Sequence, residues 1–403
     1  MPPGEAAELL SPAPGLFDRP SDLPPLPCRR TTLYHAGQPG SEGRFCHHPN
    51  LVVFREQLFC MFSNGLEGED LPGQRVLYCR SPDGVNWSAA EVLASSGPEG
   101  TCVAAGWHSY MDDSGEATLV AYFTVVAGGD NFHPETALHA VTSRTGLEWT
   151  SPAERIVAGF FIEGPRLLHL PSENTHDAWR GRTETRLLLC GEQVGAARKR
   201  GRMKVLITER RSGLEGWAEA SPPLEDTHLS VFGYCEGAAI VSAEASGANG
   251  DTVAQHLALA FRSNTGRLFV SEAQQPDLQG GGWSSPRQSG FPDSESRFHS
   301  GVLPDGSAIL INNPMPRSGP DDYDRSVLTV ARSTDGGRRF AEAWVLRGEP
   351  TAPRFDGLYK LAGYQYPHAV CWREQLFVAF SVNKEDVELC ACALEALTGG
   401  PKM

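Results

Sequence analysis

Polar residues able to carry out acid–base chemistry recur at six places along the 403-residue sequence, each at the start of an apolar, strand-like run. Four of these starts carry histidine and two carry glutamate, while arginine, tyrosine and tryptophan complete the set. The residues are His47 or His48, Trp107, His108, Glu163, Arg166, Glu236, His299, Tyr366 and His368. Imidazole, carboxylate and phenol groups are common proton carriers and nucleophiles in enzymes. If the six runs converge in space, their starts line one pocket for a polar ligand.

A repeated motif predicts that the runs do converge. Five segments place Ser-x-Asp/Thr-Gly, or a degenerate form of it, after a strand and an aromatic residue a few positions later. The aromatic residues are Trp87, Trp149, Trp217, Trp283 and Phe340. Their spacing of about 60 residues is typical of a four-stranded propeller blade. Within the motif, Ser and Asp side chains bond to local backbone groups and Gly supplies a positive φ, so we expect these boxes to be structural.

Six run starts and five boxes predict an all-β, six-bladed β-propeller with Asp-box hairpins over residues 31–398. The last blade is expected to close with the N-terminal part of the chain, because a closed ring leaves no free sheet edge. Residues 1–30 are rich in proline and are expected to be extended or disordered. The innermost strands of a propeller start near its axis, so the six starts should form a central funnel, and we expect the histidines on one face.

Composition narrows the choice of partners. The formal net charge of −14 argues against nucleic acid or an anionic membrane as a partner. No apolar stretch reaches 18 residues, and the first residues lack a basic segment followed by an apolar one, so neither a membrane span nor a signal peptide is expected. Ten scattered cysteines without zinc-type pairing are typical of free thiols in a reducing compartment, which predicts a cytoplasmic protein.

The C-terminal half carries a family resemblance. The stretches FHSGVLPDGSAILINNP, RSTDGG, GYQYPHAV and FSVNKED resemble the exo-α-sialidase-like branch of the sialidase superfamily of BNR/Asp-box propellers. The resemblance covers nearly the whole chain and implies a six-bladed fold and a glycan substrate. In that superfamily a tyrosine paired with a glutamate is the nucleophile, an aspartate is the acid/base, and three arginines bind the carboxylate of the sugar.

The resemblance assigns roles to four residues of this chain. Tyr366 matches the nucleophile, Glu236 its partner, and Arg262 the second arginine, while Arg325 is a looser match for the third. Two family positions differ. The first-blade arginine is replaced within His47-His48-Pro49, and we expect the acid/base aspartate to be replaced at Trp107-His108-Ser109-Tyr110. These differences predict an altered substrate.

Three functions are compatible with the sequence. The first is a glycoside hydrolase acting on an anionic or acidic-sugar glycan, without a cofactor. Its expected catalytic residues are Tyr366, Glu236, His108 in the acid/base role, and His299. Its expected substrate-binding residues are Arg262, Arg166, Arg325, His48, Trp107, His368 and Glu163.

The second function is a polysaccharide lyase that eliminates across uronate glycans with a histidine or tyrosine base. A divalent metal ion could assist it, because imidazoles on converging strands suit Mn²⁺, Zn²⁺ or Ni²⁺. The weak candidates for metal ligands are His48, His108, His299 and His368. The third function is a non-catalytic propeller that binds glycan or protein.

Overall fold

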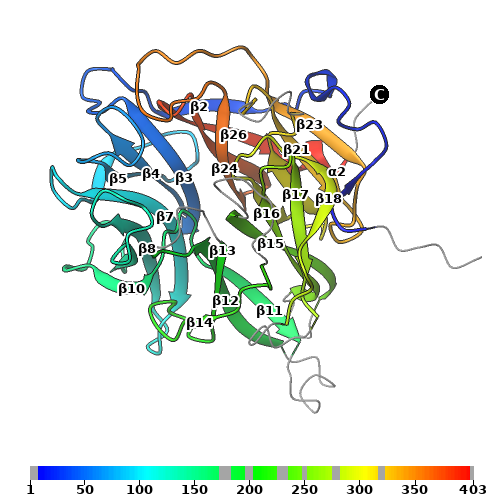
Figure 1. The fold of residues 1–403 in the computed structure, drawn as a ribbon, viewed down its shortest axis with the longest axis horizontal. Coiled ribbons are helices and arrows are strands. Elements are labelled where there is room, and N and C mark those ends of the chain that lie inside the picture. The colour runs from blue at the N-terminus through cyan, green and yellow to red at the C-terminus, as the bar shows by residue number, and fades with distance from the viewer. Residues whose placement is uncertain are drawn as a thin grey trace, which may run out of the picture.

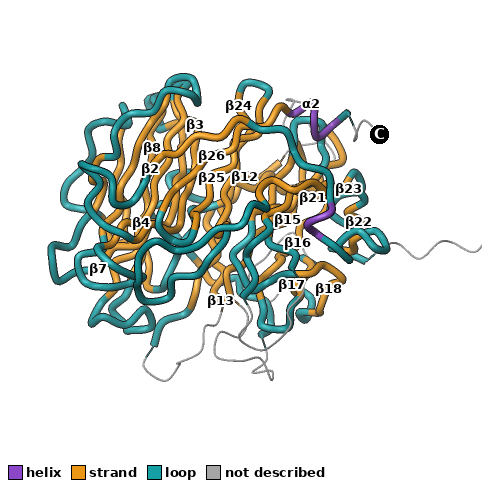
Figure 2. Tube along the Cα trace, turned by 90° about the horizontal axis from the view of Figure 1, so that it is seen from above, coloured by secondary structure: helices purple, strands orange, loops and turns teal. Residues whose placement is uncertain are grey.

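Six four-stranded antiparallel sheets surround a central axis in the computed structural model, which describes residues 8–171, 183–195, 203–224, 235–246, 252–274, 282–315 and 323–399. Figure 1 shows the sheets arranged as the blades of a propeller, which confirms the predicted fold class. Strands dominate the chain, and the described helices are the short α2 (Leu394–Thr398) and the 3₁₀ helix η1 (Pro20–Asp22) (Figure 2). Among the described residues, none of the helices has the length and apolar character to cross a membrane.

Each blade runs from an innermost to an outermost strand in nearly sequential order. Blades 1 to 3 are β3(Phe45–Phe54)-β4(Gln57–Gly65)-β5(Arg75–Ser81)-β6(Glu91–Ala94), β7(Thr101–Met111)-β8(Ala117–Val126)-β9(Ala137–Ser143)-β10(Glu154–Ala158) and β11(Arg166–Pro171)-β12(Thr183–Glu192)-β13(Met203–Thr208)-β14(Ala218–Glu219). Blades 4 to 6 are β15(Cys235–Ser246)-β16(Thr252–Arg262)-β17(Arg267–Glu272)-β18(Arg287–Pro292), β19(His299–Val302)-β20(Ala308–Asn312)-β21(Leu328–Ser333)-β23(Glu342–Arg347) and β24(Tyr364–Trp372)-β25(Gln375–Val382)-β26(Asp386–Ala393)-β2(Arg29–Tyr34).

The last blade takes its outermost strand from the beginning of the chain. β2 pairs antiparallel with β26 in the register Arg30↔Cys390 and Thr32↔Glu388. This pairing joins the two ends of the propeller by backbone hydrogen bonds. The ring is therefore closed in the way the repeat count predicts.

Residues 8–28 lie against the outside of the propeller. β1 (Ser11–Pro12) pairs in parallel with β22 (Arg339–Phe340), and the neighbouring Leu9 and Leu10 are fully buried in the core between blades 4 and 5. This part of the Pro-rich segment is therefore extended and packed. Residues 1–7 lie outside the described residues.

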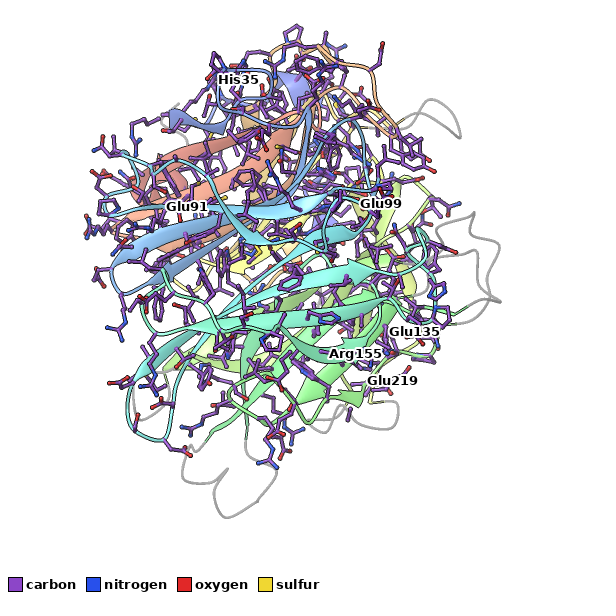
Figure 3. All side chains as sticks on the ribbon, turned by 90° about the vertical axis from the view of Figure 1, so that its left-hand side faces the viewer. His35, Glu91, Glu99, Glu135, Arg155 and Glu219 are labelled. Atoms are coloured by element: carbon purple, nitrogen blue, oxygen red, sulfur yellow. The ribbon has the colours of Figure 1, made fainter. Side chains whose placement is uncertain are left out.

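The outermost strands carry exposed charges. Glu91 on β6, Arg155 on β10 and Glu219 on β14 are exposed along the flank seen in Figure 3. Charged side chains at a sheet edge oppose pairing with another chain, because a second strand would have to desolvate them. The outer edges of these blades are thus protected against pairing with another chain, while the inner strands are buried.

The Asp boxes form tight turns held by their own side chains. In blade 1, the backbone N–H of Gly84 donates to Ser81 Oγ at 2.8 Å, and those of Val85 and Asn86 donate to Asp83 Oδ1 at 2.8 Å. Gly84 itself has a φ of +72°, a conformation that glycine adopts without steric cost. The boxes are therefore local structural devices, as their residue types indicate.

The box glycines also set the distance between blades. A Cβ atom at Gly84 would lie 2.5 Å from the ring of Phe377 in blade 6, and one at Gly146 would lie 2.5 Å from the ring of Phe59 in blade 1. Each box turn is thus pressed against a phenylalanine of the preceding blade. A side chain at these positions would push the two blades apart.

Replacing Gly146 by Ala should destabilise the protein through this contact. Gly115 offers a matched control, because it has nearly the same φ (+79° against +77°) and its Cβ position has no atom within 4 Å. Gly115→Ala should cost about 1–2 kcal/mol from backbone strain alone, and Gly146→Ala about 1–3 kcal/mol more from overpacking. Urea unfolding measures both. Equal losses for the two variants would show that the box turn is not pressed between the blades.

Candidate active site in the central funnel

Three innermost strands contain a β-bulge whose central residue is left-handed. These residues are His48 in β3, Glu236 in β15 and Tyr366 in β24, with φ values of 54°, 50° and 56°. Bulges re-aim side chains, and left-handed residues other than glycine carry strain that is concentrated at functional sites. The same local distortion therefore marks three different blades at the entry of their inner strands.

Tyr366, Glu236 and Arg262 form one hydrogen-bonded cluster across the funnel. Tyr366 Oη donates to Glu236 Oε1 at 2.5 Å. Arg262 Nη1 donates to Glu236 Oε2 at 2.7 Å and to Tyr366 Oη at 3.2 Å. The side chains of Glu236 and Arg262 are each 8% exposed. Three of the four residues assigned by the resemblance are thus brought together from blades 4 and 6.

The environment separates the protonation states of this cluster. Burial by itself would raise the pKa of Glu236, but the charge of Arg262 and the hydrogen bond from Tyr366 outweigh it and lower that pKa. Burial, together with the charge of Glu236, raises the pKa of Tyr366 well above its usual range. At neutral pH, an ionised carboxylate therefore accepts a hydrogen bond from a neutral phenol.

Arg325 lies on the other side of the phenol. Its guanidinium carbon is 5.7 Å from the centre of the Tyr366 ring, and its nitrogens donate to Gln365 Oε1 at 2.5 Å and to the Glu295 carbonyl at 2.8 Å. The buried Asp293 feels the charges of both Arg262 and Arg325, and burial raises its pKa to about 7. Two fixed guanidinium groups therefore flank the tyrosine.

His47 and His48 occupy the first-blade position beside the same tyrosine. The ring centres of His47 and Tyr366 are 4.0 Å apart, and those of His48 and Tyr366 are 5.3 Å apart. Both Nε2 atoms face Glu69 Oε1, at 3.8 Å and 3.7 Å. Lys384 forms a very short ion pair with the other oxygen of Glu69.

Sequence reasoning missed Glu69 and Lys384. Glu69 lies in the turn-rich loop between β4 and β5, and Lys384 lies in the hairpin between β25 and β26. Neither belongs to a repeated element. The only sequence pointer to Lys384 is its place inside the FSVNKED stretch, which carried the family resemblance but no assigned role.

A second polar group lies two residues further along β24. The rings of His299 and His368 are 4.9 Å apart, and Glu163 Oε1 lies 3.9 Å from His368 Nε2 and 3.6 Å from Arg297 Nη2. Arg166 points its Nη1 to the Ser300 carbonyl at 2.6 Å rather than to a carboxylate. This second group, made of His299, His368, Glu163 and Arg166, thus gathers at the axis. Among the described residues, no hydrogen bond or ion pair joins it to the cluster of Tyr366, Glu236 and Arg262.

Trp107 and His108 do not join either group, which corrects their expected place in the funnel. Their strand β7 begins at Thr101, so Trp107 lies six residues beyond its start. The Trp107 indole packs in the core between blades 1 and 2, and His108 Nε2 lies 2.7 Å from the Arg211 carbonyl, in a groove also lined by Phe54. Phe54 ends β3, about 20 Å along the strand from His47. The prediction placed the start of β7 at Trp107, whereas this residue lies in the second half of the strand, away from the axis.

Two further carboxyl groups have raised pKa values. Burial and the charge of Glu236 raise the pKa of Glu192 to about 8. Burial and the charge of Glu69 raise the pKa of Asp70 to about 6, and Asn131 donates to Asp70 Oδ2 at 2.7 Å. Glu192 and Glu236 line one small cavity. Carboxyl groups with separated pKa values are the usual source of an acid and a base in one site.

Comparison with solved structures identifies the fold but not the activity. The chain is similar to a sialidase (TM-score 0.59, 15% identity), covering 95% of this chain and 35% of that one. It is also similar to the leech intramolecular trans-sialidase, with a TM-score of 0.56 and 9% identity over 92% of this chain and 71% of that one. Its similarity to Trypanosoma rangeli sialidase has a TM-score of 0.57 and 11% identity over 93% of this chain and 60% of that one. The chain thus spans about a third of the length of the first of these. No curated protein matches it by sequence.

The sequence itself matches a family model. The match to the BNR repeat-like domain runs over residues 56–378, which takes in part or all of every blade. Sialidases share the six-bladed arrangement described above. The chain is therefore a member of the BNR repeat-like family, within the superfamily of sialidase-like propellers.

Proposed function

We propose that this protein is a glycoside hydrolase that cleaves a terminal acidic sugar from a glycan, with Tyr366 as nucleophile and Glu236 as its base. The observation that carries the proposal is the 2.5 Å hydrogen bond from Tyr366 Oη to Glu236 Oε1, flanked by two buried arginines. A nucleophile bonded to its base and oriented by a third group is the general signature of covalent catalysis.

The first chemical step follows from the cluster geometry. Tyr366 Oη forms a bond to the anomeric carbon of the sugar while its proton passes to Glu236 Oε1. The bond between the anomeric carbon and the leaving oxygen breaks, and that oxygen takes a proton from a general acid. A water oxygen then bonds to the anomeric carbon and passes one proton to the deprotonated general acid, while the sugar–tyrosine bond breaks and the phenoxide takes back the proton from Glu236. A neutral phenol suits an acidic sugar, because a carboxylate nucleophile would repel it.

Arg262 and Arg325 supply the binding site for the sugar's carboxylate. Guanidinium groups pair with carboxylates through parallel hydrogen bonds, which fix both position and orientation. Both groups are fixed in place by hydrogen bonds to Glu236 and Gln365, so little ordering is needed on binding. Burial raises the pKa of Asp293 to about 7 and that of Glu192 to about 8, so these neighbouring carboxyl groups neutralise the arginine charges only in part near neutral pH.

Asp70 is the proposed general acid in place of His108. Its pKa of about 6 lets it hold a proton in mildly acidic solution, where an ordinary aspartate is ionised, and release it in the transition state. It is partly exposed and neighbours Glu69, whose carboxylate faces the histidines beside Tyr366. Glu192 is 8% exposed and lies deeper, so it is less able to reach a leaving group.

A polysaccharide lyase and a non-catalytic binding propeller explain the same pocket less well. A lyase with His108 as base loses support, because His108 contacts Arg211 instead of the funnel residues. A pure binding module gives no reason for a buried phenol bonded to an ionised carboxylate. Incubation with uronate glycans separates the two enzymes, because elimination creates an unsaturated sugar that absorbs ultraviolet light and hydrolysis does not.

Tyr366→Phe should lower kcat on a fluorogenic glycoside of an acidic sugar by about 10³-fold or more, because the covalent nucleophile is lost. Tyr364→Phe is the matched control, since this neighbouring buried phenol bonds to Glu349 and not to Glu236. The control should keep its turnover. Full activity of Tyr366→Phe on a cleaved substrate would refute the mechanism.

Glu236→Gln should be almost as damaging to kcat and should also lower stability. The substitution keeps the shape of the side chain but breaks the buried ion pair with Arg262, and breaking such a pair costs about 3–5 kcal/mol. Urea unfolding and kcat on the same variant separate the two effects. A stable variant with normal turnover would contradict both the pairing and the base role.

The pH profile should identify the acid. If Asp70 donates the proton, kcat/KM falls as pH rises through about 6, because the donor loses its proton there. Asp70→Asn should abolish this limb and lower kcat by about 10²–10⁴-fold. An alkaline limb near pH 8 that is removed by Glu192→Gln would instead assign the role to Glu192.

A further inference from the structure

His47, His48 and Glu69 form a compact group of three potential ligand atoms. Each residue offers one ligand atom, a ring nitrogen or a carboxylate oxygen, and these three atoms all lie within 4.8 Å of one another. The two imidazoles face Glu69 Oε1 at 3.8 Å and 3.7 Å, with their rings tilted by 52°. Neither distance is a hydrogen bond, because hydrogen bonds from nitrogen to oxygen are about 2.7–3.2 Å long.

The backbone is distorted in a way that brings both imidazoles to this carboxylate. Consecutive residues of a regular strand point to opposite faces, so His47 and His48 would normally diverge. The bulge in β3 and the left-handed His48, with φ of 54°, turn both rings toward Glu69. A strained conformation at a polar cluster is typical of a site that binds something.

The second nitrogen of each ring is held by a serine. Nδ1 of His47 lies 2.7 Å from Ser381 Oγ, and Nδ1 of His48 lies 3.1 Å from Ser63 Oγ. Metal-binding histidines are oriented by such a partner on the nitrogen away from the ion. His47 Nε2, in contrast, is fully buried and has no hydrogen-bond partner among the described residues. This orphaned nitrogen aims at the space that an ion would fill.

We propose that His47, His48 and Glu69 bind a divalent transition-metal ion, with zinc as the ion that fits this donor set. Tetrahedral zinc with bonds of about 2.0–2.1 Å places its donors about 3.3 Å apart, so the two distances from imidazole nitrogen to Glu69 Oε1, 3.8 Å and 3.7 Å, need to close by about half an ångström. Lys384 holds the second oxygen of Glu69 and leaves Oε1 for the ion. Three protein ligands leave a fourth position open, as in catalytic zinc sites.

The role of this ion rests on the proposed function. The site lies beside Tyr366, at the blade position where the superfamily resemblance expects the first carboxylate-binding arginine. An ion with an open position there would supply the third positive contact for the sugar's carboxylate, beside Arg262 and Arg325. The nearby Lys384 and Arg325 weaken the attraction for a cation, whereas Glu69 and Glu236 strengthen it.

The group Glu163, His299 and His368 also meets the distance criterion but fits a metal less well. The backbone N–H of Leu51 donates to His368 Nδ1 at 3.1 Å, so the neutral ring carries its proton on Nε2. That is the nitrogen facing Glu163, and a protonated nitrogen cannot bind a metal. Arg297 already contacts the same carboxylate. His299 Nδ1 in this second group also lacks a hydrogen-bond partner among the described residues, but the protonated Nε2 of His368 leaves the group one donor short for a metal.

Zinc binding by the full chain tests the proposal. After treatment with a chelator and its removal, calorimetric titration with zinc chloride should show one ion per chain, and zinc should raise Tm. His48→Gln and Glu69→Gln should each weaken Kd by about 100-fold or more, because loss of an orienting outer partner alone costs 10–100-fold. His108→Gln is the matched control, as this buried histidine bonds to Arg211 far from the site, and its Kd should equal that of the wild type.

Two results would overturn the assignment. One is a wild-type chain that binds no zinc. The other is zinc binding that survives His48→Gln and Glu69→Gln but is lost in His299→Gln, which would place the ion in the second group. Circular dichroism of each variant excludes loss of folding as the cause. Tyr366→Phe separates this proposal from the enzymatic one, because it should lose turnover and still bind zinc with the wild-type Kd.

Discussion

The antiparallel pairing of β2 with β26 is the constraint on which the rest of the molecule depends. It joins residues 29–34 to the last blade, and thereby holds six sheets around one axis. Residues 236, 262, 325 and 366 come from blades 4, 5 and 6 and meet only because the blades are wedged together. The glycine turns pressed against Phe377 and Phe59 set the spacing that makes this convergence reproducible. The site is thus a property of the closed ring rather than of any single blade.

Closure also decides the electrostatics of the funnel. Burying Glu236 would be costly alone, and it stays ionised because Arg262 and the Tyr366 hydroxyl are bonded to it. Glu192 and Asp293, which have no such bonds among the described residues, respond differently, because burial raises their pKa values to about 8 and about 7. The same burial therefore leaves Glu236 ionised at neutral pH while these two carboxyl groups titrate close to it. Proton transfer at neutral pH needs this difference between neighbouring acids.

Strain is the third element of the design. His48, Glu236 and Tyr366 are left-handed residues in bulges of three separate inner strands, where a regular strand would point them elsewhere. The surrounding sheets hold these conformations in place, because each bulge is flanked by paired residues on both sides. The pairing of the flanking strands thus offsets the backbone strain of three residues whose polar side chains point into the funnel. The first blade uses this device to present two imidazoles and a carboxylate where an arginine was expected.

By itself, the sequence determined the repeat, and through it the six blades and the closing strand. It also predicted the convergence of Tyr366, Glu236 and Arg262. These features follow from box spacing and inner-strand starts, which are local patterns that recur in register. It did not determine how far along a strand a polar residue lies from the axis. Trp107 and His108 were misplaced for that reason, since β7 begins at Thr101 inside an apolar run that gives no sign of its start. Glu69 and Lys384 became part of the site only through tertiary structure. They lie in loops that carry no motif, and they pair with each other across 315 residues of sequence, which no local pattern encodes.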